Sequence, residues 1–171
     1  MKKPMYIAKA KVYDADDNME YVGTATVTLP SLEANTVTIE GFGVLGSVDM
    51  PAQGSFGSFK LSLGFRGLTQ KNIDVMNGVK SYEIRAAQNA FDTGLNKYVP
   101  QQIRIAVTGP VTTYDLGEME IPNTMSVNAE IEALSFKLWL DKSLKIELDK
   151  FNDIHKINGN DIMQAINELV D

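Results

Sequence analysis

Three glycines in the first third of the chain have the spacing of a phosphate-binding loop. Gly41, Gly43 and Gly46 match the pattern G-x-G-x-x-G, in which backbone amides approach a pyrophosphate. This chemistry needs a strand before the loop and a helix directly after it, because amides at the helix N-terminus bind the phosphate. Residues 47–51 (SVDMP) do not begin a helix. The pattern therefore does not predict a nucleotide site.

An acidic cluster at residues 14–18 (DADDN) is a candidate for calcium binding. An EF-hand loop that began at Asp14 would need glycine at its sixth position and glutamate at its twelfth. Met19 and Ala25 occupy those positions and cannot take these roles. The cluster instead predicts a solvated hairpin turn.

The residues needed for nucleophilic catalysis are also scarce. There is no cysteine, and His155 is the only histidine. A serine triad needs a histidine beside a serine and an acid, but residues 54–57 (GSFG) do not have the spacing of G-x-S-x-G. We therefore expect no enzyme, cofactor or metal site, and we expect His155 on a surface strand or loop. A hydrolase with paired carboxylates remains open, because such pairs cannot be recognised in a sequence.

Composition fits one folded domain over residues 1–171. Of the 171 residues, 44% are hydrophobic and 22% charged, which is near the globular average. With a net charge of −6 and no run of three Lys or Arg, tight nucleic-acid binding is not expected. No apolar run is long enough to span a bilayer, and the two N-terminal lysines precede no apolar signal segment. We expect no membrane insertion and a location in the cytoplasm where the chain is made.

Alternation with a period of two, which is typical of β-strands, dominates the pattern. It occurs at residues 25–29, 59–65, 82–86 and 103–107, at residues 144–148 after an expected tight turn at Lys142-Ser143, and in the long segment 125–140. In that segment Asn128, Glu130 and Glu132 share a polar face, until the apolar set shifts by one residue. A shift of one residue reverses the two faces, which predicts a β-bulge or bend near residues 133–135.

Two segments have helical features. Residues 68–76 lie between Gly67 and the pair Asn77-Gly78, which predicts a left-handed stop at the C-terminus of the helix. Near the C-terminus, apolar residues recur at three- and four-residue spacing over residues 162–170, and Asn160 is the expected N-cap.

The segment of residues 41–57 (GFGVLGSVDMPAQGSFG) combines five glycines and a proline with apolar residues that we expect to be exposed. We expect an extended glycine-rich loop rather than a packed strand, and long loops in compact domains usually carry function. The apolar residues are Phe42, Val44, Leu45, Val48 and Met50.

The order of these features resembles the major tail tube proteins of contractile-tailed phages and of phage-tail-like bacteriocins (tailocins). The resemblance rests on residues 28–32 (TLPSL), the glycine-rich residues 41–49, the strand-to-helix passage 62–78, and the closing residues 147–161. In the closing segment, Glu147-Leu148-Asp149 and Asn152 precede 157–161 (INGND), and Lys150 stands where the family resemblance leads us to expect proline. The resemblance covers residues 21–171.

This resemblance implies a mainly-β fold with one or two helices, an antiparallel β-sandwich or barrel of the tail tube type, which is shared with type VI secretion tube proteins. Subunits would form hexameric rings by self-assembly and stack into the inner tube of a virion tail or tail-like particle, assembled in the bacterial host cytoplasm. Implied partners are the tail sheath protein, the tape measure protein, and baseplate, tail initiator and terminator proteins. DNA would pass through the tube without specific binding.

Within this picture, the loop 41–57 would make the contact between stacked rings. The face of Asn128, Glu130 and Glu132 would line the lumen, where negative charge repels phosphates. The rival interpretation is a small β-sandwich module that binds a ligand or receptor of a phage-like particle through the glycine-rich loop.

Overall fold

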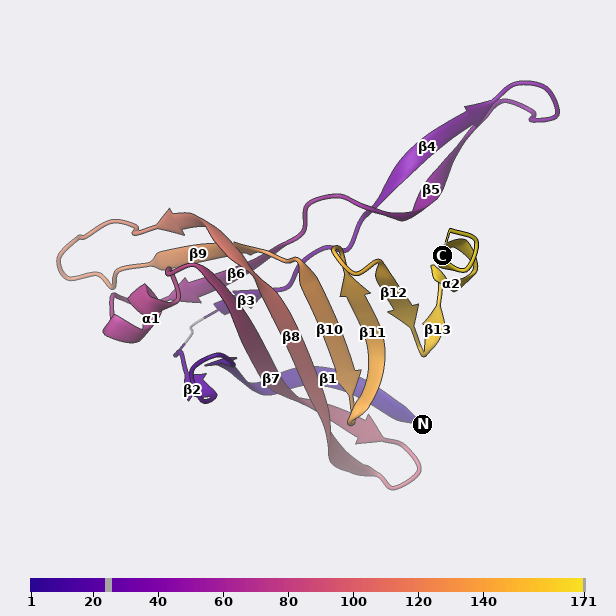
Figure 1. The fold of residues 1–171 in the computed structure, drawn as a ribbon. Helices are drawn as coiled ribbons and strands as arrows, with labels where there is room; N and C mark the ends of the chain where they lie inside the picture. Colours follow the sequence, from indigo (N-terminus) through magenta and orange to yellow (C-terminus); the bar gives the residue numbers. More distant parts are fainter. Residues whose placement is uncertain (24–25, 171) are drawn as a thin grey trace.

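The structure is a computed structural model that describes residues 1–23 and 26–170. Two antiparallel sheets stack as an open sandwich, and a two-stranded hairpin projects from one end (Figure 1). The mainly-β antiparallel fold with two short helices confirms the expected fold class, in its sandwich form rather than as a closed barrel.

The large sheet has the strand order β13-β12-β11-β10-β8-β7-β1-β2. Its longest pairing joins β7 and β8 along fourteen consecutive residue pairs, from Val79 opposite Pro110 to Asp92 opposite Lys97. The strands of this sheet are β1 (Lys2–Asp14), β2 (Glu20–Tyr21), β7 (Val79–Asp92), β8 (Lys97–Asp115), β10 (Ser135–Leu140), β11 (Ser143–Asp149), β12 (Ile154–Ile157) and β13 (Asn160–Asp161).

The small sheet contains β3 (Thr26–Thr28), β6 (Lys60–Phe65) and β9 (Val127–Glu132), and the end of β8 completes it. The long strand β8 therefore belongs to both layers: it pairs with β10 up to Thr108 and with β9 from Val111 onward. Of the predicted strand 25–29, residues 26–28 form β3, whereas Ala25 lies outside the described residues.

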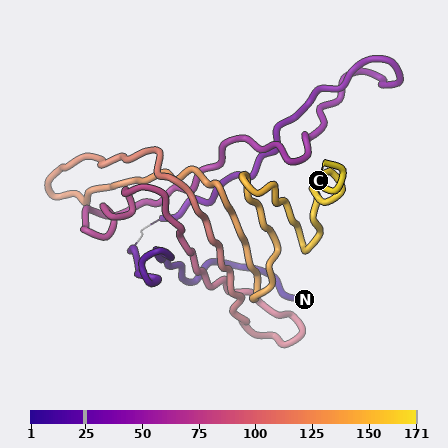
Figure 2. The backbone as a smooth tube through the Cα atoms, viewed as in Figure 1, coloured from indigo at the N-terminus to yellow at the C-terminus, as the bar shows by residue number. Residues whose placement is uncertain are grey.

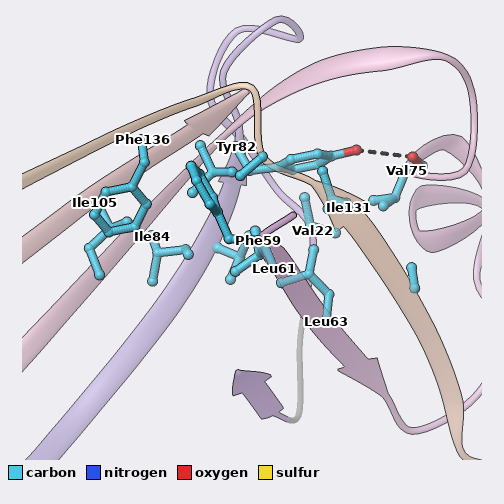
Figure 3. Packing of buried hydrophobic residues seen from close by; sticks show 14 of the residues in the cluster. Val22, Phe59, Leu61, Leu63, Val75, Tyr82, Ile84, Ile105, Ile131 and Phe136 are labelled. Atoms are coloured by element: carbon cyan, nitrogen blue, oxygen red, sulfur yellow. Dashed lines mark hydrogen bonds between the residues drawn. The ribbon is translucent and has the colours of Figure 1, made fainter. Parts of the chain in front are cut away.

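Alternating apolar side chains of the two sheets form the core between them (Figure 3). Tyr82 at its centre is fully buried, and its hydroxyl donates a 3.0 Å hydrogen bond to the carbonyl oxygen of Val75. Burial raises the pKa of Tyr82 because the phenolate would lose its hydration. Other fully buried members of the core are Leu61, Leu63, Val12, Val107, Val127, Ala129 and Ile131.

The break predicted near residues 133–135 is confirmed, with a larger consequence than a bulge. The strand β9 ends at Glu132 in the small sheet, and β10 begins at Ser135 in the large sheet. The one-residue shift of the apolar pattern therefore marks a crossing between layers, with Ala133 fully buried at the crossing.

The first predicted helix exists as α1 (Gln70–Asp74), which is shorter than residues 68–76. Thr69 caps it reciprocally with Asn72: the Thr69 hydroxyl accepts from the Asn72 amide, and the Asn72 side chain accepts from the Thr69 amide. Gly78 follows at φ +77°, in the left-handed region expected for it.

The second predicted helix exists as α2 (Gln164–Asn167), which is much shorter than residues 162–170. The predicted cap is wrong, because Met163 rather than Asn160 occupies the N-cap position. Asn160 and Asp161 form β13 instead, pairing with β12. The Leu169 and Val170 side chains are mostly exposed, so no core element packs on the apolar stripe to extend the helix.

The glycine-rich segment is not the extended loop that we expected. Residues 41–46 form only the tip of a β-hairpin, between β4 (Ala34–Glu40) and β5 (Ser47–Phe56) (Figure 2). The strand β5 contains Pro51 and Gly54, which we expected to prevent a packed strand. An isolated two-stranded hairpin leaves one edge of each strand unpaired, and this edge tolerates proline.

Candidate functional site: a projecting arm and the sheet faces

The β4–β5 hairpin, here called the arm (residues 34–56), pairs with no other strand of the described chain. It extends away from the sandwich, with its tip far from both sheets (Figure 1). The tip turns through Gly41, Gly43 and Gly46, all at positive φ (+122°, +92° and +98°). These φ angles favour glycine, which explains the G-x-G-x-x-G spacing without any phosphate. The strand β5 follows in place of a helix.

One face of the arm is apolar. Val37 lies opposite Met50, and Ile39 lies opposite Val48. Each of these four side chains is about half exposed, between 45% and 55%. The sequence had identified Val48 and Met50, but not their cross-strand partners, because pairing depends on register.

The tip adds two large side chains, Phe42 and Leu45, that are fully exposed, while Val44 is partly buried. The Val44 amide donates a 3.1 Å hydrogen bond to the Gly41 carbonyl oxygen, which closes the turn. An apolar face that continues into an apolar tip is a liability in an isolated subunit and indicates a contact surface.

Polar pairs fix the register of the arm. On the face opposite the apolar one, the Thr38 hydroxyl donates to Asp49 Oδ1 at 2.6 Å. Near the base, where the pairing shifts register, the Asn35 amide donates to the Ser55 hydroxyl at 2.8 Å. Because a one-residue slip would exchange the two faces, these pairs keep the apolar residues together on one side.

The base of the arm is held by Lys150. Its Nζ donates to the Gly57 carbonyl oxygen at 3.0 Å and to Glu132 Oε1 at 3.2 Å, and it lies 4.0 Å from the Phe59 ring centroid. The residue that departs from the expected proline therefore joins the arm, the small sheet and the β11–β12 turn.

His155 also packs at the base of the arm. His155 is half-buried on β12, and its ring meets the edge of Phe56 from the arm at a centroid distance of 4.9 Å. Met163 lines the same pocket as Phe56 and His155, and a Cβ added at Gly54 would lie 2.6 Å from the Met163 methyl group. His155 is therefore a packing residue, not the surface residue that we expected.

The three residues predicted to line a lumen do share one outward face of β9. Asn128 is exposed, and Glu130 and Glu132 are half-exposed. Lysines accompany both carboxylates: Lys60 Nζ lies 3.1 Å from Glu130 Oε2, and Lys150 binds Glu132. The face therefore carries less negative charge than its glutamates alone would give it.

Glu132 is the most strongly held of these groups. Burial raises its pKa, but the Ser58 hydroxyl at 2.5 Å and Lys150 outweigh burial, so the pKa of Glu132 lies below its usual value. A carboxylate that accepts hydrogen bonds is stabilised in its charged form. Glu132 is thus a carboxylate that stabilises the base of the arm in its charged form.

The acidic cluster forms the turn between β1 and β2, as expected, but it is not wholly solvated. Asp14 is buried, and its carboxylate lies 2.7 Å from Lys80 Nζ. Hydrogen bonding to Asp14 raises the pKa of Lys80, since it favours the charged ammonium. Across residues 1–23 and 26–170, no group of three or more His, Asp or Glu side chains is arranged to hold a metal.

A basic row on the open face of the large sheet was missed by sequence reasoning. Lys11, Arg85 and Arg104 lie in register on three neighbouring strands, although no run of three cations exists along the chain. Only the strand register brings them together, and residue spacing along the chain gave no signal for it.

None of the helices formed by the described residues has both the length and the apolar character required to cross a bilayer.

Comparison with known proteins identifies a matching family model and similar solved structures. The family model described as phage tail tube protein FII matches residues 4–169. Among solved structures, the chain is similar to one from a cryo-EM structure of an extracellular contractile injection system, the PVC sheath/tube terminator in its extended state. Identity is 13% and the TM-score 0.56, over 80% of this chain and 96% of that chain, which supports the fold alone. No curated protein matches.

Proposed function

The chain belongs to the phage tail tube protein FII family, and we propose that it builds the inner tube of a contractile tail or tail-like particle as stacked hexameric rings. The ring symmetry and the conduit for DNA or effector passage are part of this proposal. So are the partners: the sheath, the tape measure protein, and the initiator, baseplate and terminator proteins. The chain then has a structural role, in a virion tail or tail-like particle assembled in the bacterial cytoplasm.

The arm is the observation that carries the proposal. Its tip exposes Phe42 and Leu45 completely, and its apolar face adds four half-exposed side chains. Burying an apolar side chain of this size contributes about 1.5–3 kcal/mol. An arm that reaches beyond its own subunit can bury these groups only against another molecule, and the adjacent ring supplies the same partner surface at every step of a stack.

The rest of the fold supports a role in assembly. No described strand covers the outer edge of β1 over residues 2–10, where Tyr6 and Ile7 are exposed. Continuing a sheet into a neighbouring copy removes such edges. The outward face of Asn128, Glu130 and Glu132 is proposed to line the conduit, where lysine partners reduce its charge and DNA or protein slides without being held.

Negative-stain electron microscopy of the purified chain over a range of concentrations tests the proposal. Rings at low concentration and hollow tubes at high concentration are expected. A chain that stays monomeric at every concentration, and also after addition of a tail initiator complex, would contradict the proposal and favour the ligand-binding module.

A further inference from the structure

Four cationic side chains gather on the open face of the large sheet, although the chain carries a net charge of −6. Lys11 on β1 lies opposite Arg85 on β7, and Arg85 lies opposite Arg104 on β8. Lys9 lies two residues before Lys11 on the same strand and lines the same hollow as Lys11 and Arg85. We call Lys9, Lys11, Arg85 and Arg104 the basic face.

This arrangement is unfavourable for the isolated subunit. Like charges directly opposite each other on neighbouring strands destabilise a sheet. Within the basic face, the buried Glu83 accepts from Arg85 Nε at 2.5 Å and from Arg104 Nη2 at 2.9 Å. The single carboxylate of Glu83 cannot balance four cations, so the basic face keeps a net positive charge. The face is therefore preorganised for an acidic partner.

The chemistry of the surface favours an acidic polypeptide over nucleic acid. Proteins that bind single-stranded nucleic acid stack bases on aromatic rings next to their cations. The rings beside the two arginines are occupied, because Arg85 covers the Tyr13 ring at 4.9 Å and Arg104 covers the Trp139 ring at 4.6 Å.

An apolar hollow adjoins the cations on this face. Its volume is about 400 Å³, and Ala86, Ala87 and Pro100 form part of its lining together with Lys9 and Lys11. It therefore suits a segment in which an apolar side chain stands next to carboxylates.

The chain itself contains such a segment. The loop between β8 and β9 begins Leu116-Gly117-Glu118-Met119-Glu120-Ile121, which alternates acidic and apolar residues. Met119 is 81% exposed and Ile121 is 98% exposed. Within the described parts of the chain, neither Glu118 nor Glu120 forms an ion pair. We call residues 116–121 the acidic loop.

The acidic loop of one copy is remote from its own basic face. It follows the end of β8 on the side of α1, where the Tyr114 hydroxyl donates to the Met76 carbonyl oxygen (Figure 1). Asp115 lies eleven residue steps beyond Arg104 on β8, which is about 36 Å along the strand at 3.3 Å per residue. The complementary surfaces therefore have to meet between copies.

We propose that the acidic loop of one subunit docks on the basic face of the next subunit. Glu118 and Glu120 then neutralise the excess cations, and Met119 enters the hollow beside Ala87. Because the two surfaces differ, the contact is heterologous and generates either a closed ring or a filament. This inference rests on the proposed function and assigns the surfaces that join subunits within it.

Charge exchange between two variants tests the contact. K9E/K11E reverses the basic face, and E118K/E120K reverses the acidic loop. Each variant alone should need a concentration at least about tenfold higher to oligomerise in sedimentation velocity, because like charges then face each other. An equal mixture should assemble again, since each loop then meets a face of opposite charge in an alternating ring.

Crosslinking provides a second readout that does not depend on the charge variants. The chain has no cysteine, so M119C/A87C introduces the only thiols. A short bis-maleimide should produce a ladder of covalent oligomers, whereas the control M119C/Q164C should remain mostly monomeric. A ladder in the control and none in M119C/A87C would overturn the proposal.

Failure of this inference differs from failure of the proposed function. If the wild-type chain forms rings or tubes and both charge variants assemble equally well, only the docking contact is wrong. The contact is also wrong if the variants fail alone and the mixture does not recover while M119C/A87C gives no ladder. A different result would assign the basic face to nucleic acid: K9E/K11E still assembles, and the wild-type chain binds single-stranded DNA but K9E/K11E does not. A wild-type chain that never oligomerises would overturn both.

Discussion

Single residues decide how the arm is attached. Lys150 binds the carbonyl oxygen of Gly57, the residue directly after the arm, and the carboxylate of Glu132 on the small sheet. From the sequence, Lys150 was visible only as a departure from the expected proline. Its role depends on a contact across 93 residues of chain, which periodicity cannot indicate.

Replacing Lys150 by methionine should lower the free energy of unfolding by about 1–3 kcal/mol, because a partly buried carboxylate loses its ammonium partner. Urea denaturation measures this effect. The matched control Lys97→Met removes an exposed lysine that makes no ion pair among the described residues, and it should change stability by less than about 0.5 kcal/mol. Equal effects of the two substitutions would refute the role of Lys150.

Glu132 should make the free energy of unfolding depend on pH. Its folded-state pKa lies below the ordinary 4.5, because the hydrogen bonds from Ser58 and Lys150 outweigh burial. The contribution is therefore complete above pH 4.5 and is lost as the pH falls through the folded-state pKa.

Thermal melts of wild type and Glu132→Gln between pH 7 and pH 3 measure this dependence. The variant should lose less stability than wild type as the pH falls. Glu40→Gln, an exposed arm residue, should follow the wild-type curve. Parallel curves for wild type and Glu132→Gln would exclude the predicted pKa shift.

At the scale of elements, β8 connects the two layers, and Gly109 marks the point where it changes partners. A Cβ at this position would lie 1.7 Å from the Glu132 carbonyl oxygen. The backbones of β8 and of the β9–β10 crossing therefore approach as closely as only glycine allows. Period-two alternation located both strands, but not this contact between them.

Gly109→Ala should destabilise the chain by about 2 kcal/mol or more, since the obstructing atom is backbone and cannot rotate away. Chemical denaturation gives the value. Gly57→Ala is the control, because a Cβ there meets only ordinary contacts at 3.8 Å and beyond and its φ is not positive. A well-folded Gly109→Ala with the stability of Gly57→Ala would show that the layers do not meet there.

The elements that sequence predicted best are those stabilised by the shared core. The strand at residues 59–65 exists almost as predicted, because Leu61 and Leu63 alternate into the core. The C-terminal helix is shorter than predicted because Leu169 and Val170, at the end of its apolar stripe, stay exposed. The arm was missed as a hairpin because Pro51 and Gly54 lie within β5, where the unpaired edge of the strand tolerates them.

At the scale of the whole molecule, the proposed conduit face can be tested by chemical accessibility. Asn128→Cys would be the only cysteine, on the exposed face of β9. In assembled tubes it should react with a small maleimide but not with a polymer-linked maleimide too bulky to enter the lumen. Dispersed subunits should react with both reagents. Equal reaction of tubes with the bulky reagent would place this face outside the lumen.

The central claim is that the arm joins one ring to the next, and electron microscopy of wild type beside the double variant Phe42→Asp/Leu45→Asp tests it most directly. Both side chains are fully exposed in the subunit, so circular dichroism and melting temperature should be unchanged. Loss of their burial, at about 1.5–3 kcal/mol each, should raise the concentration needed for tube growth by about a hundredfold or more. Tubes of wild type and only rings or monomers of the variant are the predicted result. Variant tubes as long and as abundant as those of wild type would contradict the account.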